Sequence, residues 1–292
     1  MNGRTIRDEA YFAGTRYDGP VFARRRQVLR ETVARLSDGG RRHYATLAQE
    51  NVARWAREAV AGPQSAEGPR VRVVPLDWGV ATAELTRETG RCCAVLNMAN
   101  AYSPGGAYIE GTAAQEENLF RRSDCHEAVS HADLDVRKER YLPEVTALLS
   151  ARDGRVYLDT ESPRVCLRGP EERGRADLGY EWLADAEVFP FFELRAAALD
   201  LRGGRRFDEA EARRRIEAQL RTLEHAGVRY AVLSAFGCGA FENPADRVAR
   251  LYRDALRTHG AALREVVFAI YAPGYGPDNY TPFAQVLQAA VG

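Results

Sequence analysis

The hydrophobic pattern of the chain predicts three strands that are buried on both faces. Nearly continuous apolar runs lie at residues 92–98 (CCAVLNM), 230–235 (YAVLSA) and 266–271 (VVFAIY). Runs of this length without polar alternation are typical of parallel strands that helices cover on both sides. Residues 71–74, 155–159, 164–167 and 186–194 give weaker strand signals. The turn at Ser162-Pro163 separates two of these, and Pro190 favours a strand edge or start for the last.

Helical spacing of apolar residues alternates with these strands. The predicted helices cover residues 25–36, 48–60, 81–88, a stretch beginning near 115, and 142–149, 207–226, 244–259 and 282–291. This alternation predicts an α/β fold in three layers with a mixed sheet. Residues 1–20 show no regular hydrophobic pattern, and the composition of residues 62–69 (GPQSAEGP) indicates a connector. We therefore expect an N-terminal helical extension over 1–69 that packs on a core domain over 70–292.

Composition narrows the possible functions. The chain has 292 residues, 45% of them hydrophobic, and 41 basic residues balance 41 acidic ones. Net neutrality argues against a dedicated nucleic-acid binder that neutralises phosphates. Five cysteines show neither zinc-type spacing nor a disulfide framework, which suits reduced thiols in the cytoplasm. The first residues lack the apolar core of a signal peptide, and no run approaches the length of a membrane span, so we expect no membrane association.

Candidate chemistry concentrates in residues 97–125, NMANAYSPGGAYIEGTAAQEENLFRRSDC. Two adjacent glycines in a turn allow a ligand to approach the backbone closely. Thr112 and Gln115 have capping-box spacing, which would place Glu116 and Glu117 in the first turns of a helix. Paired glutamates at a helix start are also ordinary capping chemistry. The order of the motif, a strand end, a glycine turn and then Gln-Glu-Glu, is more specific than any of its parts.

A second glycine turn, Gly237-Cys238-Gly239, follows the predicted strand at 230–235. A turn between a strand and a helix directs backbone N–H groups at negative charge, although it is also a common tight connection. It matches neither the dinucleotide fingerprint nor a Walker loop. Phe241 beside it could position a sugar or belong to the core. Together the two turns suggest a ligand with phosphate and sugar groups, and a glutamic acid that protonates a glycosidic oxygen.

At this point the sequence resembles the bacterial-type poly(ADP-ribose) glycohydrolases, which are built on a macrodomain. Their signature is a turn of three glycines, a short spacer and Gln-Glu-Glu; here it reads PGGA, seven residues and QEE. The segments ESPRVCLRG and LSAFGCGAFENP also resemble the family, as does RETVARLSDGGRRHY in the N-terminal region. The resemblance implies a three-layer α/β/α macrodomain-like fold and a hydrolase that releases ADP-ribose from poly(ADP-ribose).

The resemblance also implies roles for individual residues. Glu117 would protonate the ribose–ribose glycosidic oxygen and then activate water, while Glu116 would orient the terminal ribose. The residues implied to bind ADP-ribose are Asn97, Asn100, Gly105, Gly106, Ala107, Gln115, Ala235, Gly237, Cys238, Gly239, Ala240, Phe241, Tyr271 and Asp77.

These residues divide by the part of ADP-ribose that they would bind. The first turn and Asn100 would hold the distal ribose and diphosphate, with Gln115 and Asn97 as support. The second turn would wrap the diphosphate, and Phe241 would position the distal ribose. By analogy with macrodomains, Tyr271 would stack on the adenine, and Asp77 would hydrogen bond to it.

The chain departs from the family at Ala107, which replaces the third glycine of the signature. The added methyl fits if the φ angle there is negative; otherwise it narrows the site or alters the substrate. The alternatives are therefore removal of single ADP-ribose units from protein or nucleic acid, and a non-enzymatic ADP-ribose-binding module. The resemblance implies no metal and no cofactor. The expected partner is poly(ADP-ribose) on modified proteins in a DNA damage response, and we expect a monomer.

Overall fold

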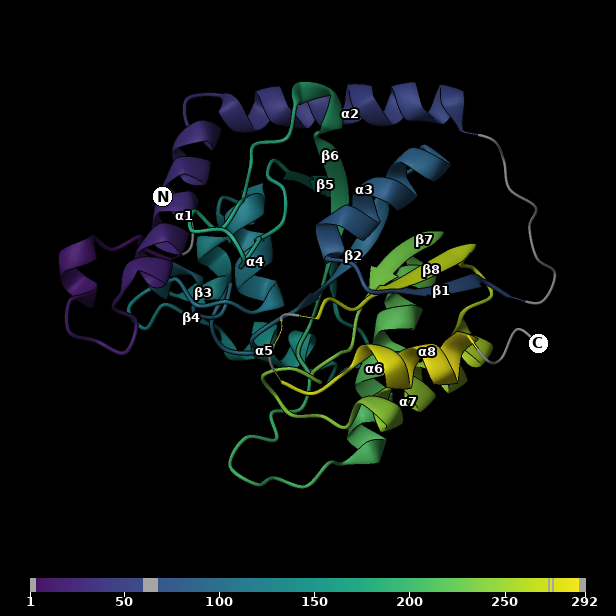
Figure 1. Ribbon diagram of the computed structural model, residues 1–292. Helices are drawn as coiled ribbons and strands as arrows, with labels where there is room; N and C mark the ends of the chain where they lie inside the picture. Colours follow the sequence, from purple (N-terminus) through teal and green to yellow (C-terminus); the bar gives the residue numbers. More distant parts are fainter. Residues whose placement is uncertain (1–3, 60–67, 273, 275, 289–292) are drawn as a thin grey trace.

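A six-stranded sheet forms the centre of the computed structural model, which describes residues 4–59, 68–272, 274 and 276–288 (Figure 1). The strand order is β1-β8-β7-β2-β6-β5, and neighbouring strands are parallel except β5, which is antiparallel to β6. The strands are β1 (Arg70–Val74), β2 (Cys93–Met98), β5 (Tyr157–Cys166), β6 (Phe189–Ala196), β7 (Tyr230–Leu233) and β8 (Glu265–Ala269). The predicted mixed sheet is thereby confirmed.

Helices cover both faces of this sheet. One face carries α6 (Glu209–His225), α7 (Ala245–His259) and α8 (Tyr280–Gln288). The other carries α3 (Trp78–Thr89) and α4 (Gln115–Arg122), together with α1 (Pro20–Leu36) and α2 (Gly40–Glu58). Neighbouring residues of β2 divide between the two cores, since Ala94 packs with the first set of helices and Val95 with the second. The strand is therefore buried on both faces, as its unbroken apolar run predicts.

Smaller elements complete the described chain. They are α5 (Pro143–Leu149), a hairpin of β3 (Leu134–Asp135) and β4 (Arg140–Tyr141), and the 3₁₀ helices η1 (Glu9–Phe12), η2 (Tyr108–Glu110), η3 (Asp124–His126), η4 (His131–Asp133) and η5 (Asp185–Glu187). Within the described residues, no helix is both long enough and apolar enough to cross a membrane.

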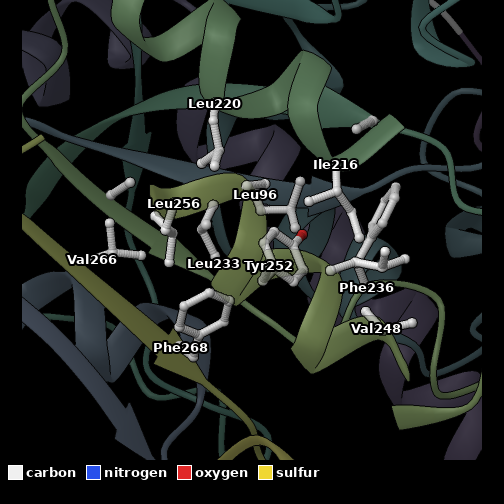
Figure 2. Packing of buried hydrophobic residues seen from close by; sticks show 14 of the residues in the cluster. Leu96, Ile216, Leu220, Leu233, Phe236, Val248, Tyr252, Leu256, Val266 and Phe268 are labelled. Carbon is white, nitrogen blue, oxygen red and sulfur yellow. The ribbon is translucent and has the colours of Figure 1, made fainter. Parts of the chain in front are cut away.

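The core between the sheet and the helices α6 and α7 consists mainly of apolar side chains (Figure 2). Strand side chains pack there against helix side chains from positions spaced by three or four residues. The labelled members are Leu96, Leu233, Val266 and Phe268 from the strands, Ile216, Leu220, Val248, Tyr252 and Leu256 from the helices, and Phe236 from the turn after β7. The buried hydroxyl of Tyr252 donates a hydrogen bond to Gln219 Oε1 at 2.8 Å, so it is satisfied. This packing gives the loops at the strand ends a rigid base.

Several bounds differ from those of the predicted elements. The second helix begins at Gly40 rather than at residue 48, because polar residues on its exposed face continue the helix without an apolar signal. The pieces on either side of Ser162-Pro163 form one strand, β5, whose register shifts between Asp159 and Arg164. Pro190 lies at the start of β6, which is one of its two predicted placements, and β6 is an interior strand. Most of the predicted connector 62–69 and the end of the last helix lie outside the described residues.

The topology brings four loops to one edge of the sheet. Strands β1, β8, β7 and β2 are adjacent and parallel, so the chain leaves all four at the same side. The loops that follow them contain Asp77, Tyr271, the turn at 237–241 and the turn at 105–107, respectively. Ligands of open α/β sheets bind outside the carboxyl ends of the strands, and these loops hold the sites predicted from the sequence.

Candidate active site

The first glycine turn needs its two glycines for both conformation and space. Gly105 and Gly106 have φ angles of +71° and +59°, in the left-handed region that side chains with a Cβ disfavour. A Cβ on Gly105 would lie 2.4 Å from the Tyr108 ring, and one on Gly106 would lie 2.6 Å from Glu117 Oε1. Ala107 has a φ of −106°, which any residue can adopt. The departure from a third glycine is therefore accommodated by the backbone.

Glu116 uses both carboxylate oxygens to hold the loop that precedes it. Oε2 accepts a hydrogen bond from Asn100 N at 2.7 Å, and Oε1 accepts one from Gly105 N at 3.0 Å. The residue is only 4% exposed. Burial raises the pKa of Glu116 well above its usual value, and the neighbouring Glu117 carboxylate adds to the rise. Glu116 thus organises the turn from within.

Glu117 is held differently, since only one of its oxygens is occupied. Oε1 accepts hydrogen bonds from Ala107 N at 3.1 Å and from Thr112 Oγ1 at 3.3 Å. Oε2 has no partner among the described residues, and it is not among the polar atoms that are sealed from solvent. The side chain is 9% exposed. The structure therefore fixes one oxygen of Glu117 and leaves the other for a ligand.

The expected capping box at Thr112 and Gln115 is wrong. The N-cap of α4 is Ala114, and no side chain caps the helix. The Thr112 hydroxyl instead donates to Ala107 O at 2.8 Å and closes the glycine turn. The Gln115 amide reaches the end of β2, where it donates to Leu96 O at 2.7 Å and accepts from Met98 N at 3.0 Å. Competing hydrogen bonds to the loop and to the strand outweigh the local cap.

The two asparagines of the NMAN segment face different surroundings. Asn100 Oδ1 accepts hydrogen bonds from Tyr102 N at 2.8 Å and Ser103 N at 3.0 Å, which folds the chain toward the glycine turn. Asn97 is buried in β2, where its amide donates to Glu193 Oε1 at 2.8 Å. Its Oδ1 atom is buried without a partner among the described residues. Ligand contacts of both residues stay predictions.

A buried charge cluster that the sequence analysis missed lies on β6 beside β2. Glu193 binds Arg195 Nε at 2.7 Å and Arg164 Nε at 3.2 Å, and all three side chains are buried. Burial alone would raise the pKa of Glu193, but the guanidinium of Arg195, followed by that of Arg164, lowers it to about 2. The only sequence signal for this cluster is a pair of charges inside the apolar strand FPFFELRA.

The second glycine turn connects β7 to α7 and is held by Asn243. Gly237 has a φ of +75°, and a Cβ there would lie 2.5 Å from Ala198 Cβ. The amide of Asn243 donates to the carbonyl oxygens of Leu199 at 2.7 Å, Gly237 at 3.0 Å and Phe241 at 3.3 Å. The sequence analysis did not single out Asn243, although Asn after a Gly-x-Gly turn is a residue that commonly binds backbone groups.

Three consecutive backbone N–H groups in this turn have no partner among the described residues: those of Gly239, Ala240 and Phe241. Gly239 and Ala240 are exposed, and a Cβ on Gly239 would meet nothing within 4 Å. Cys238 is buried behind them, and its N–H donates to Ala235 O at 3.0 Å. Free N–H groups that follow one another in a turn form a site for an anion such as a diphosphate. The Phe241 ring lies 5.0 Å from the Arg202 guanidinium, at the edge of this site.

The two residues predicted to contact adenine are Asp77, which follows β1, and Tyr271, which follows β8, at the same edge of the sheet. Asp77 caps α3, since its Oδ1 accepts from Gly79 N at 2.8 Å, and it also pairs with Arg122 at 2.6 Å. These contacts all use the Oδ1 atom of Asp77. Tyr271 is 48% exposed directly after β8. Adenine binding by either residue stays a prediction.

No group of three or more His, Cys, Asp or Glu side chains in the described residues could hold a metal ion. The five cysteines are free thiols, and burial raises the pKa of Cys238 well above its usual value. The described site places a carboxyl group and a turn with free backbone N–H groups at one edge of the sheet.

One family model matches part of the chain. A model described as "Microbial-type PARG, catalytic domain" matches residues 22–144, which include the first glycine turn and both glutamates. PARG denotes poly(ADP-ribose) glycohydrolase. None of the curated proteins matches the chain. The resemblance expected from the sequence motifs is confirmed by this match.

Solved structures agree over nearly the whole chain. The enzyme from Thermomonospora curvata, at 25% identity, has a TM-score of 0.61 and covers 90% of this chain and 99% of its own. Its structure with the inhibitor ADP-HPD, also at 25% identity, gives 0.58 with 89% and 98% covered. The enzyme from Deinococcus radiodurans in complex with ADP-ribose gives 0.53 at 21% identity, with 85% and 92% covered, and shows the fold alone. The expected macrodomain-like fold is confirmed.

Proposed function

We propose that this protein is a poly(ADP-ribose) glycohydrolase, which is a glycosidase. The match to the catalytic-domain model and the similarity of its fold to the bacterial enzymes support this proposal. The protein hydrolyses O-glycosidic bonds between ribose units and releases ADP-ribose. One observation carries the chemistry: of two adjacent buried glutamates, Glu116 gives both oxygens to backbone N–H groups, while Glu117 keeps Oε2 unoccupied. Adjacent helical residues point about 100° apart, so they serve separate tasks.

In the proposed reaction, the Glu117 carboxyl group donates its proton through Oε2 to the glycosidic oxygen. The bond between that oxygen and the anomeric carbon breaks, the electron pair stays on the leaving oxygen, and an oxocarbenium-like centre forms. A water molecule then attacks the anomeric carbon and returns a proton to Glu117. The hydrogen bonds from Ala107 N and Thr112 to Oε1 keep the carboxyl group oriented during both transfers.

The second turn would bind the diphosphate of the ADP-ribose that is released. The unpartnered N–H groups of Gly239, Ala240 and Phe241 support this assignment, because they supply donors without a side-chain charge. The parallel pairing of β2 with β7 supports a single ligand that spans both turns. Tyr271 follows β8 and Asp77 follows β1, so both would then lie toward the adenine.

We further propose that the protein acts as a monomer in the cytoplasm on poly(ADP-ribose) attached to modified proteins, within a DNA damage response. The family match supports the substrate, and the reduced state of the five cysteines supports the compartment. Equal numbers of acidic and basic residues, 41 each, argue against a separate nucleic-acid partner.

The test measures ADP-ribose release from automodified poly(ADP-ribose) without added metal. Wild type is compared with Glu117→Gln and with Glu144→Gln, which alters an exposed glutamate in the first turn of another helix, α5. We expect Glu117→Gln to lose about 10²–10⁴-fold in kcat while it still binds ADP-ribose in calorimetry, and Glu144→Gln to match wild type.

Comparable turnover in Glu117→Gln would refute the assignment of the acid. Release by wild type from mono-modified protein or nucleic acid, but not from polymer, would indicate a mono-ADP-ribosyl hydrolase. ADP-ribose binding without release from any of these substrates would indicate a non-enzymatic binding module.

A further inference from the structure

The N-terminal segment reaches the first glycine turn through one side chain, Arg4. Its Nη1 atom donates a hydrogen bond to Gly106 O, and its Nη2 atom pairs with Glu110 Oε1 at 3.1 Å. The guanidinium carbon also lies 5.7 Å from the centroid of the Tyr108 ring. The side chain is only 9% exposed, so these contacts are shielded from water. A residue more than a hundred positions away in sequence thus touches the turn beside the two glutamates.

The contact with Gly106 is important because the same peptide unit also binds Glu117. The carbonyl of Gly106 and the N–H of Ala107 belong to one planar peptide. The carbonyl accepts from Arg4, and the N–H donates to Glu117 Oε1 at 3.1 Å. Fixing the carbonyl therefore fixes the direction of the N–H that holds Glu117. Hydrogen bonds in such a chain also polarise one another, which strengthens the bond to the carboxylate.

We propose that Arg4 is a positioning residue for Glu117 that acts through the Gly106–Ala107 peptide and keeps Oε1 occupied so that Oε2 faces the substrate. This inference rests on the proposed function. Without Arg4, the peptide can rotate about ψ of Gly106 and φ of Ala107, because Gly106 has no Cβ that restricts ψ. Rotation would withdraw the N–H from Oε1 and leave Glu117 with only the bond from Thr112.

Arg7 provides a matched control in the same segment. It pairs with Glu139 at 2.7 Å and is 26% exposed, so it anchors the N-terminal segment to another part of the chain. If Arg4 served only to anchor this segment, Arg7→Ala should produce the same effect. A second control is Glu110→Gln, which removes the ion pair but leaves the hydrogen bond from Arg4 to Gly106.

The experiment combines kinetics with amide hydrogen exchange on the full chain. We expect Arg4→Ala to lower kcat about tenfold with KM within about twofold, a loss of about 1.4 kcal/mol that matches one charge-assisted hydrogen bond. Exchange in a peptide that covers residues 105–112 should become about tenfold faster. Arg4→Lys, which can still donate to Gly106 O, should recover most of both losses, and Arg7→Ala and Glu110→Gln should resemble wild type.

Wild-type kcat and unchanged exchange at 105–112 in Arg4→Ala would overturn the proposal. The same losses in Arg7→Ala would also overturn it, because they would show that the segment is only an anchor. If the wild type released no ADP-ribose, the proposed function would fail while the exchange comparison still decided whether Arg4 holds the peptide. A fall in kcat that Arg4→Lys does not recover, without faster exchange, would count against the proposal as well.

Discussion

Gly106 combines a positive φ with a close approach to the carboxylate of Glu117, so the structure admits no side chain there. Its φ of +59° costs an L-residue about 1–2 kcal/mol. A Cβ there would lie 2.6 Å from Glu117 Oε1, which is closer than such atoms approach, so the carboxylate would have to move. That movement breaks the hydrogen bonds from Ala107 N and Thr112, for a further loss of about 1.5–3 kcal/mol. Together we expect Gly106→Ala to destabilise the fold by about 3 kcal/mol.

The activity of Gly106→Ala should fall by more than its loss of stability alone would cause, because the displaced group is the proposed acid. A misplacement of about 1 Å costs on the order of 10²-fold in rate. We therefore expect Gly106→Ala to lose about 100-fold in kcat for ADP-ribose release at a temperature where the variant stays folded. Denaturant unfolding would measure the stability, and initial rates on poly(ADP-ribose) would measure the activity.

Two substitutions serve as controls for Gly106→Ala. Ala107→Gly restores the third glycine of the family signature at a φ of −106°, so kcat should stay near that of wild type. Gly239→Ala adds a Cβ that meets nothing within 4 Å, so the free energy of unfolding should change by less than about 1 kcal/mol. If Gly106→Ala kept kcat within about threefold of wild type and lost no stability, the geometry of the first turn would be refuted. If Ala107→Gly raised kcat severalfold, the methyl at 107 would be a constraint that the backbone angle does not reveal.

Three further predictions concern residues outside the first turn. Asn243→Ala removes two hydrogen bonds to carbonyl oxygens of the second turn and one to Leu199 O, so the KM for polymer and the Kd for ADP-ribose should both rise about tenfold while kcat changes less; an unchanged Kd in calorimetry would contradict this. Burial, helped by the charge of Arg4, lowers the pKa of His126 to about 4 from 6.5, so folding should lose up to about 3 kcal/mol as pH falls from about 6.5 to 4. His126→Asn should lack this loss in urea unfolding at pH 7, 5.5 and 4.5. The lowered pKa of Glu193, about 2 against 4.5, contributes stability that is present above pH 4.5 and is lost as pH falls toward 2. Glu193→Gln should be about 3 kcal/mol less stable at pH 7, with a difference that shrinks in acid; a constant difference across this range would exclude the charge as its cause.

The sequence predicted the parts of the structure that local pattern determines. The run CCAVLNM became β2, buried on both faces, and Gln-Glu-Glu opened α4 as expected. The order of the strands was not predicted, because pairing between β2 and β7 depends on contacts between distant segments. Once those two strands are adjacent, however, the convergence of the two glycine turns follows from their shared direction.

The sequence could not predict which hydrogen bonds each polar side chain would choose. Thr112 has the spacing of a helix cap, yet it binds the carbonyl of Ala107, because that acceptor lies within reach only in the folded loop. Asn243 and Arg4 gave no local signal, since their partners are backbone carbonyls at a glycine turn. The φ angle of Ala107 was likewise undetermined, because alanine adopts several conformations in a loop.

The two glycine turns use their backbone N–H groups in opposite ways. In the first turn, the N–H groups of Gly105 and Ala107 donate to Glu116 and Glu117, so the loop serves to orient acids. In the second, the N–H groups of Gly239 to Phe241 have no described partner, and the side chains of Asn243 and Asn279 bind carbonyl oxygens and leave the donors free. Charge explains the difference: a turn that already faces two carboxyl groups is a poor site for a diphosphate, whereas an uncharged turn with free donors is a good one. This difference agrees with the proposed function, in which the glycosidic oxygen of the substrate lies at Glu117 and its diphosphate lies at the second turn.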